Sequence, residues 1–446
     1  MLILIYIFDS LRRDFLACYG DVGAMTPHLD RFAAHATRFT HAYAAAAWSK
    51  ASGAALLTGE LPRAVRMRAL LDSLPAGVPT LSERLQTAGF RTVAVSANPF
   101  ISHDFGLLRG FEQTVEAFRP GVLPSETALF HANHFRRLAD SLSVDPSALV
   151  LARSEALHRA LLDLMPTHEP TFALCWSMDT HAPFFVRGNK SYFGNPFNCV
   201  IPAADPEWLT GGLTVRDMVT LYRDMIAYND AHFGAFVYTL QQRGQWDDAL
   251  VIVTGDHGEA FGEHGLMGHT NGLWEEQITV PLLVKYPKQS VSRLCDTPVS
   301  LMDIGATISK VIGLPLFDHS ELSGIPHSDL AHQPVIAHSF SFTQPERHHE
   351  TQTRRALLLE NPTGWGLRVG DWKVMAATDN ATPLVFNLRT DPGERRPLTD
   401  RALHRELVAR ATALQQAADE RAAQWNISDE EIDDLVLERL RGLGYL

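Results

Sequence analysis

The chain has 446 residues, of which 46% are apolar and 20% charged, the proportions of a folded globular protein. Because this length exceeds one ordinary core, we expect two domains, or one large domain with an appendage. The net charge of −12 argues against binding to nucleic acids or anionic membranes, which would need a basic face, but a small anionic substrate stays compatible with it.

The first segment, MLILIYIFDSLRRD, contains an apolar run that is too short to cross a bilayer. It also lacks the basic start and the small-residue cleavage site of a signal peptide. The cysteines are widely spaced, without a CxxC pair, which favours free thiols in a reducing compartment; they are Cys18, Cys175, Cys199 and Cys295. These features predict a cytoplasmic protein whose first strand begins almost at residue 1.

Apolar runs alternate with helical patterns along most of the chain. We predict strands at 2–8, 91–97, 171–178, 249–255 and 281–287, and helices near 26–37, 80–88, 150–165 and 215–243. Continuous apolar strands separated by helices are typical of a mostly parallel sheet that helices cover on both faces. Ligands of such sheets bind beyond the carboxyl ends of the strands. The polar residues at those ends are Asp9, Asn98, Asp179, His181, Asp256 and His257.

The pattern changes after about residue 330. Short apolar runs (PVIAHSF, RALLLE, WGLRVGDWKVMAA and PLVFNL) indicate strands joined by turns, and a charged helix follows from about 402 to 424. We therefore predict a catalytic α/β domain over residues 1–330 and a smaller α+β subdomain with an antiparallel sheet over 331–446. The segments 117–150 and 187–213 are predicted to be insertions or lids over the functional edge of the sheet.

An Asp–His pair follows one predicted strand, in TGDHGEAFGEHG (residues 254–265). Carboxylate and imidazole groups are both ligands of divalent ions, although an aspartate that caps a helix would explain the triplet DHG equally well. Asp9 supplies a second carboxylate at another strand end. Two acidic residues at the ends of strands in one parallel sheet can converge on one ion, so we predict a divalent metal site there.

A hydroxyl residue stands at a predicted loop-to-helix junction in WSKASGAALLTG (residues 48–59). Ser49 precedes a helix-forming run, so its hydroxyl would lie at a helix N-terminus, where backbone N–H groups stabilise an anion. A bound metal can lower the pKa of such an oxygen and make it a nucleophile. An ordinary N-cap serine is the competing interpretation, and the local sequence leaves both open.

Taken together, these blocks resemble the sulfatase branch of the alkaline phosphatase superfamily, over nearly the whole chain. The resemblance is carried, in order, by FDSLRRDFLACYG, TPHLDRFAAHATRFTHAYA, WSKASGAALLTGELP, MDTHAPF, VIVTGDHGEAFGEHG, VPLLVKYP, LRVGDWKVM and FNLRTDPGE. It implies the alkaline phosphatase/sulfatase-like α/β fold with a smaller C-terminal subdomain. It also implies a divalent metal and the hydrolysis or transfer of a sulfate, phosphate or phosphonate ester.

The same resemblance implies roles for single residues. The metal-ligand positions of the family are occupied by Asp9, Asp256, His257 and, through its nucleophilic oxygen, Ser49. Positions that face the anionic group or the leaving group of the substrate are occupied by His181 and His269. Lys50 and Asn98 would lie near the phosphoryl oxygens as substrate-binding residues, although a solvated Lys50 fits the sequence as well.

Four positions depart from the sulfatase pattern. The Asp pair after the first strand is Asp9-Ser10, so one carboxylate is missing, and Gly53 replaces the arginine that signals conversion of the nucleophile to formylglycine. Asn98 stands in place of a block containing lysine and histidine, and His269 in place of a lysine. Because a sulfated serine is released slowly whereas a phosphorylated serine can be displaced in line, these departures favour an unmodified Ser49 and a phosphomonoester or phosphodiester substrate.

Other functions stay compatible with the sequence. They are a sulfatase in which Ser49 is the formylglycine precursor, a transferase that passes a phosphoryl group to an alcohol, and a non-catalytic binding protein. The ligand set favours Mn²⁺ or Zn²⁺, with Ca²⁺ or Mg²⁺ as alternatives. A second ion could be held by Asp179, His181 and His269, although substrate hydrogen bonding or general acid duty explains these histidines too. The run ERHHE (346–350) is expected to be an exposed loop, and homo-oligomerisation stays open.

Overall fold

The structure is a computed structural model that describes residues 1–119, 121–123, 152–182, 214–270, 272–317, 356–361, 364–376, 382–426 and 432–442. The predicted domain boundary near 330, the runs PVIAHSF and ERHHE, and most of the segments 117–150 and 187–213 lie outside these ranges. Cys199 lies outside them as well, and the other three cysteines are free thiols.

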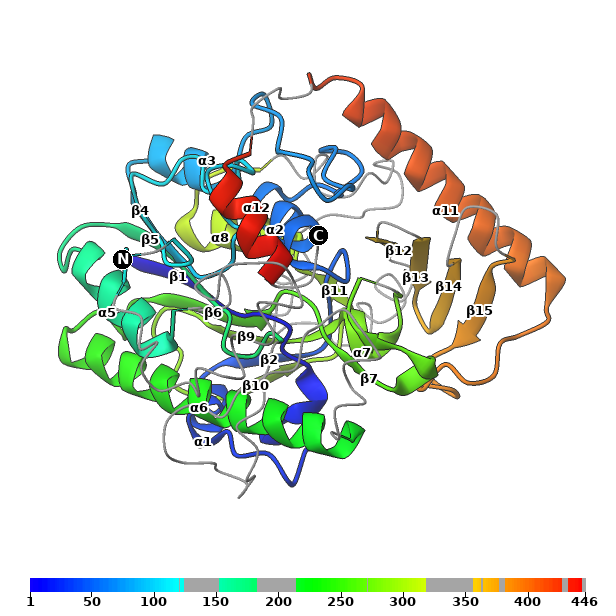
Figure 1. The fold of residues 1–446 in the computed structure, drawn as a ribbon, viewed down its shortest axis with the longest axis horizontal. Helices are drawn as coiled ribbons and strands as arrows, with labels where there is room; N and C mark the ends of the chain where they lie inside the picture. The colour runs from blue at the N-terminus through cyan, green and yellow to red at the C-terminus, as the bar shows by residue number, and fades with distance from the viewer. Residues whose placement is uncertain are drawn as a thin grey trace.

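A nine-stranded mixed sheet forms the centre of the molecule, in the order β10-β2-β9-β6-β1-β5-β3-β4, with β11 paired to β2 (Figure 1). Its strands are β1 (Leu2–Phe8), β2 (Thr37–Tyr43), β3 (Arg91–Ser96), β4 (Gln113–Glu116), β5 (Thr171–Ser177), β6 (Leu250–Gly255), β9 (Thr279–Lys285), β10 (Arg293–Cys295) and β11 (Val299–Ser300). The strands β6, β1, β5 and β3 are parallel to one another, as the sequence predicted, and β4, which was not predicted, continues this parallel run.

Helices cover both faces of the sheet. One face carries α1 (Pro27–Ala33), α5 (Ser154–Leu164) and α6 (Val215–Gln242), and the other carries α2 (Ser49–Thr58), α3 (Leu81–Thr87) and α8 (Asp303–Ile312). Alternate side chains of β1 enter the two resulting cores: Tyr6 and Phe8 pack with the first set of helices, and Ile5 and Ile7 with the second. All seven residues of β1 are buried, which explains why its sequence is continuously apolar.

The sheet differs from the prediction in the direction of one strand and in four strands that were not predicted, β2, β4, β10 and β11. The strand expected at 281–287 is β9, and it runs antiparallel to both β6 and β2. The connection, residues 256–278, is long enough for a crossover, but its described part contains no long helix to carry the chain across a face of the sheet. It contains β7 (Ala260–Phe261), a 3-10 turn (Glu263–Gly265), β8 (Met267–Gly268) and the short helix α7 (Glu275–Ile278). The strand β2 was not predicted, because its sequence TRFTHAY mixes polar and apolar residues next to a helical pattern.

The C-terminal part contains the predicted antiparallel sheet, with β12 (Ala356–Asn361), β13 (Gly364–Val369), β14 (Trp372–Ala376) and β15 (Leu384–Asn387) in sequential order. The helix α11 (Arg401–Ala422) lies along this sheet (Figure 1) and begins at Asp400, whose carboxylate accepts two backbone N–H groups. Side chains of α11 and of this sheet share a core with Ala45, Ala55 and Leu61, so the C-terminal part packs against the segment that contains α2.

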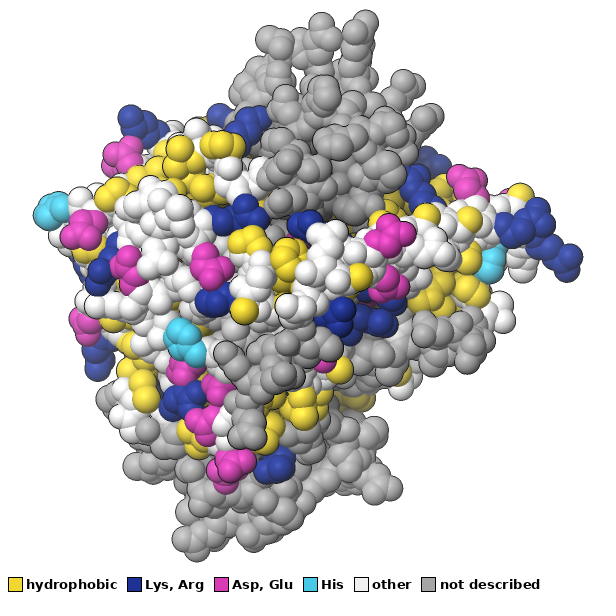
Figure 2. Space-filling model, turned by 90° about the horizontal axis from the view of Figure 1, so that it is seen from above, with side chains coloured by type: hydrophobic (Ala, Val, Ile, Leu, Met, Phe, Trp, Pro, Cys, Tyr) yellow, Lys and Arg dark blue, Asp and Glu magenta, His cyan; other side chains and the backbone are white. Residues whose placement is uncertain are grey.

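The last helix, α12 (Asp434–Gly442), packs on the start of α2: Val436 and Leu440 share an apolar cluster with Trp48 and Phe100. Basic and acidic side chains are intermingled over the described part of the face in Figure 2. Among the described helices, none combines the length and the apolar character that a bilayer crossing would require.

Candidate active site

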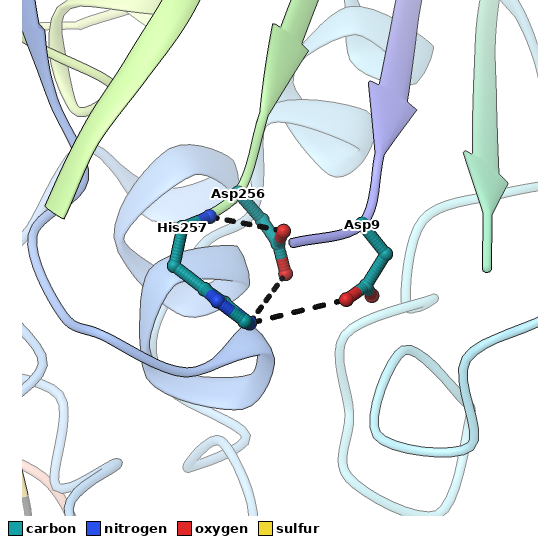
Figure 3. A group of neighbouring side chains, drawn as sticks. All are labelled: Asp9, Asp256 and His257. Carbon is teal, nitrogen blue, oxygen red and sulfur yellow. Dashed lines mark hydrogen bonds and ion pairs between the residues drawn. The ribbon is translucent and has the colours of Figure 1, made fainter. Parts of the chain in front are cut away.

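The carboxylates of Asp9 and Asp256 lie side by side because their strands are neighbours in parallel register. The last residue of β1, Phe8, is paired with Gly255 at the end of β6, so the next residue of each strand emerges at the same edge of the sheet. Figure 3 shows the two carboxylates and the ring of His257 directed toward one another. All three residues have no solvent-exposed surface.

The imidazole of His257 is oriented by the backbone. Its Nδ1 lies 2.8 Å from the carbonyl oxygen of Gly258, which can only accept, so the proton is assigned to Nδ1. The lone pair of Nε2 then faces the two carboxylates, at 3.4 Å from Asp256 Oδ2 and 3.9 Å from Asp9 Oδ1. This is the tautomer that a histidine needs to bind a metal through Nε2.

Ser49 is the first residue of α2 and not its cap. Trp48 occupies the N-cap position, and the Ser49 hydroxyl lies 3.3 Å from Asp9 Oδ2 and 3.2 Å from His257 Nε2. One turn further on, the hydroxyl of Ser52 donates to the backbone carbonyl of Asp256 at 2.6 Å, which fixes α2 against the end of β6. Ser49 is therefore not the N-cap of α2, and its oxygen lies beside the Asp9 carboxylate and the His257 ring. Its role as the nucleophile stays a prediction.

The residues present fit a divalent cation. One donor atom from each of Asp9, Asp256 and His257 lies within 4.8 Å of the others, and Asp256 Oδ2 is buried without a hydrogen-bond donor. Burial and the charge of Asp9 raise the pKa of Asp256 well above its usual range. Two buried carboxylates at this distance repel each other, and a cation between them removes that cost.

Asp9 is held from several sides. Burial alone would raise its pKa, but the charges of His181 and His257 and the hydrogen bonds from Trp176 and Asn98 lower it. The Trp176 indole N–H and the Asn98 amide each donate to Asp9 Oδ2 at 2.7 Å.

Asn98 therefore lies in the site, with its amide oxygen also accepting the N–H of Phe100 at 2.8 Å. Both ends of this amide are used to orient Asp9, and substrate contact by Asn98 stays a prediction. Ser10, where the family carries a second aspartate, contributes its backbone N–H to Asp256 Oδ1 at 2.9 Å.

Sequence reasoning missed Trp176, Thr180 and Glu259. Thr180 donates its hydroxyl to the backbone carbonyl of Asp9 at 2.5 Å. The signal for Trp176 was its place near the end of β5, next to β1, but an apolar strand residue gives no sign that its N–H reaches a carboxylate. Glu259 is two residues beyond His257 in the Asp-His-Gly-Glu string, and its burial raises its pKa to about 7.

Three histidine rings meet beside the carboxylates. The centroid of the His269 ring lies 4.4 Å from that of His257 and 5.0 Å from that of His181. The Nδ1 atom of His269 lies 3.2 Å from the Glu259 carboxylate, and that of His181 contacts the carbonyl oxygen of Ala182. The Ala182 carbonyl can only accept, so Nδ1 of His181 carries a proton. In both rings Nε2 is directed to the side opposite the Nδ1 contact. Both histidines thus lie beside the Asp9–Asp256–His257 group, and their contact with the substrate stays a prediction.

Two of the residues predicted for the site, Lys50 and Asp179, have hydrogen-bond partners other than the predicted ones. Lys50 is buried, and its ammonium donates to the carbonyl oxygens of Ala69, Leu70 and Asp72 at 2.6–2.7 Å, so its charge is directed to that loop and away from Ser49. Neither the substrate-binding nor the solvated interpretation of Lys50 matches this placement, which arises because the three carbonyls replace water around the ammonium.

Asp179, predicted as a donor for a second ion, accepts the N–H of Ser154 at 2.9 Å. Within the described part of the chain, Asp179, His181 and His269 form no group of donor atoms close enough to share an ion. A second metal at these residues therefore stays a prediction.

The contact between Glu259 and His269 leads to a testable prediction. If Glu259 orients the ring, Glu259→Gln lowers kcat by at least about tenfold, and the double variant with His269→Asn is no worse than His269→Asn alone. Kinetics of the two single variants and the double variant measure this coupling. Additive losses would instead show that Glu259 acts independently of His269.

The sequence model of the family described as "Sulfatase" matches residues 2–314. The steryl-sulfatase of Mus musculus is 26% identical over 93% of this chain and 81% of that protein. The Delta 4,5-hexuronate-2-O-sulfatase of Bacteroides thetaiotaomicron is 21% identical over 91% of this chain and 86% of its own. Among solved structures, the phosphonate monoester hydrolase of Agrobacterium radiobacter superposes with a TM-score of 0.66 at 18% identity, covering 94% of this chain and 95% of that chain.

Proposed function

The chain belongs to the sulfatase family and is a hydrolase of sulfuric or phosphoric esters, and from this premise we propose that it cleaves a phosphoric ester through an unmodified Ser49. The observation that carries this proposal is the packing at Gly53, where formylglycine-forming sulfatases have an arginine. A Cβ atom at position 53 would lie 2.7 Å from Ile101 Cδ1 and 3.1 Å from Trp176 Cη2. The space for a side chain is thus occupied by the end of the Ile101 side chain and by the edge of the Trp176 indole, which also holds Asp9.

The residues of the site divide the work as follows. Asp9, Asp256, His257 and the Ser49 hydroxyl would hold the divalent ion, for which Mn²⁺ or Zn²⁺ fits this mixed nitrogen and oxygen set. Such an ion supplies charge neutralisation at the phosphoryl oxygens and lowers the pKa of the serine hydroxyl.

In the first step the Ser49 oxygen attacks phosphorus, the bond to the leaving alcohol breaks, and the hydroxyl proton of Ser49 passes to the departing oxygen, with the Nε2 atom of His269 or His181 as its carrier. Water then attacks the phosphoserine, which releases phosphate and restores the hydroxyl. Helix α2 begins at Ser49, so its first backbone N–H groups favour the negative charge that develops there.

A sulfatase is the second candidate, and the two relatives reported above favour it, because both carry that activity in their names. It would require conversion of Ser49 to formylglycine despite Gly53. The substrate in either case is a small anionic ester, and no nucleic acid or membrane partner is proposed.

Peptide mass spectrometry of the purified protein separates the two candidates. We expect the peptide containing Ser49 at its unmodified mass, together with hydrolysis of aryl phosphate monoesters or diesters and no hydrolysis of aryl sulfates. A peptide about two mass units lighter, the hydrogen pair lost when an alcohol becomes an aldehyde, together with sulfatase activity would overturn the phosphoesterase proposal.

Enlarging position 53 tests the packing argument. An added methyl group must displace the end of the Ile101 side chain or press on Trp176, but Ala also gains about 1 kcal/mol over Gly inside a helix. Gly53→Ala is therefore expected to lower the free energy of unfolding by about 1 kcal/mol net and to reduce activity. Denaturant unfolding and kinetics measure both effects. Gly23→Ala is the matched control, since its nearest atoms lie at 3.4–3.5 Å, and it should change stability by less than about 0.5 kcal/mol. Equal effects at both positions would contradict the steric explanation.

A further inference from the structure

A second group of donor side chains lies outside the catalytic site, in a cavity of about 700 Å³ between the catalytic domain and the C-terminal subdomain. The cavity is lined by residues 12–14, 263–264 and 274–276 on one side and by residues of the segment 384–397 on the other. None of the residues assigned above to the catalytic site is among its lining residues.

Three side chains in this cavity can converge on one point. One donor atom from each of His264, Glu276 and Glu394 lies within 4.8 Å of the others, and His264 Nε2 is 3.9 Å from Glu276 Oε2. They come from separate elements: the turn after β7, the short helix α7, and the loop after β15.

Glu276 gives the clearest indication that this cavity binds a cation. Its side chain is only 9% exposed, it lines the cavity, and its Oε1 is buried without a hydrogen-bond partner. A buried carboxylate oxygen with no donor is costly, and such groups are usually paired or bound to a metal.

The neighbouring carboxylates are compensated by cations. Glu263 contacts Arg12 at 2.7 Å, and Glu394 contacts Lys373 at 2.6 Å. Glu394 Oε2 also accepts the backbone N–H of Glu275 at 2.8 Å, yet each carboxylate oxygen keeps a second lone pair for a further ligand.

His264 is held in place for such a role. Its ring stacks on Trp274 with centroids 3.6 Å apart and planes inclined by 7°. The backbones of His264 (φ 53°) and Glu394 (φ 50°) are both left-handed, a conformation that costs free energy for side chains of this size.

We propose that His264, Glu276 and Glu394 bind a divalent zinc ion that joins the catalytic domain to the C-terminal subdomain. One imidazole nitrogen and two carboxylate oxygens are a donor set that zinc accepts, with water completing the coordination. Because two ligands belong to the catalytic domain and one to the subdomain, the ion fastens the two parts together. The site is separate from the Asp9–Asp256–His257 group and does not depend on the proposed phosphoesterase activity.

The test uses the full chain carrying Asp256→Asn, which weakens the catalytic metal site. This protein is stripped with a chelator, dialysed against Zn²⁺ alone, and measured for bound zinc per chain and for the change in Tm that zinc produces. Adding Glu276→Gln is expected to remove one zinc per chain and to abolish the increase in Tm. His264→Phe, which keeps a ring for stacking on Trp274, should remove the same ion and serves if Glu276→Gln does not fold.

Glu263→Gln is the matched control. It removes a carboxylate from the same cavity, but both of its oxygens already have partners, Arg12 and the N–H of Phe261. It should leave the zinc count unchanged. If Glu276→Gln and His264→Phe keep the zinc count of their parent, or if Glu263→Gln lowers it equally, the proposal is wrong and the cluster is an ion-pair network only.

Discussion

Ser49→Ala is expected to lower kcat by at least about 10³-fold while leaving the fold unchanged, because the reaction would lose its nucleophile and no other hydroxyl replaces it. The Ser49 oxygen lies 3.2 Å from His257 Nε2 and 3.3 Å from Asp9 Oδ2, so its removal deletes one reacting atom and no apolar packing. Steady-state kinetics on the best aryl ester, with the unfolding transition as a check on the fold, measure the effect.

A matched control for this variant exists in α8. Ser309 is also a buried helical serine, and its hydroxyl donates only to the carbonyl of Gly305 within its own helix, at 3.0 Å. Ser309→Ala should therefore change kcat by less than about twofold, as expected for a substitution far from the chemistry. Residual activity of Ser49→Ala within tenfold of the wild type would show that water attacks phosphorus directly and that no covalent serine intermediate forms.

Asp256→Asn is expected to have the second large effect, and it acts in opposite directions on activity and on the stability of the metal-free protein. Activity should fall by at least about 10³-fold, because the amide is a poor ligand for the ion that activates Ser49. In the presence of chelator, however, the variant should unfold at a higher temperature than the wild type at pH 8, since it removes one of two buried like charges.

The pH dependence follows from the raised pKa of Asp256. A carboxyl group whose pKa is higher in the folded than in the unfolded state contributes most to stability below its unfolded value and loses that contribution as the pH rises. The Tm of the metal-free wild type should therefore fall, relative to the Tm of Asp256→Asn, as the pH is raised from about 4. Bound metal should remove this difference. Calorimetry with chelator and with Mn²⁺ or Zn²⁺ measures both states.

Asp230→Asn serves as the control for this pair of measurements. Burial raises the pKa of Asp230 to about 7, but its carboxylate accepts only the N–H groups of His28 and Leu29 and lies on α6, away from the site. It should retain metal and activity. If Asp256→Asn kept its metal content, or if its metal-free form were less stable than the wild type at pH 8, the repulsion between Asp9 and Asp256 would not control the stability of the metal-free protein.

The order of strands and helices in the parallel part of the sheet could be predicted because each element carries its own pattern. The run LILIYIF is continuously apolar since both faces of β1 are buried, and the capping boxes at Thr80 and Thr214 mark the starts of α3 and α6. The antiparallel direction of β9 could not be predicted in the same way. Strand direction depends on the connection between strands, and that connection has no periodic signal of its own.

The same contrast between local patterns and long-range contacts applies to the residues of the site. Asp9, Asp256 and His257 could be named from the sequence, because polar residues just beyond parallel strands must emerge at one edge of the sheet, and the resemblance to sulfatases added Ser49, His181 and His269. The structure brings the side chains of Asp9, Asp256 and His257 together, as this reasoning predicted. Lys50 follows Ser49 directly in the chain, yet on a helix adjacent residues point in different directions, and its ammonium reaches the carbonyls of the 69–72 loop.

Sequence alone thus determined which residues could do chemistry and at which edge of the sheet they would lie, because strand burial and strand-end polarity are local properties. Only the tertiary structure decided how those residues are held: the indole of Trp176 on Asp9, Glu259 on His269, and the filled space at Gly53. These contacts join residues that are distant in the chain, or depend on how rings and helices pack. Hydrogen-bond direction and excluded volume are set by that packing and leave no trace in a local pattern.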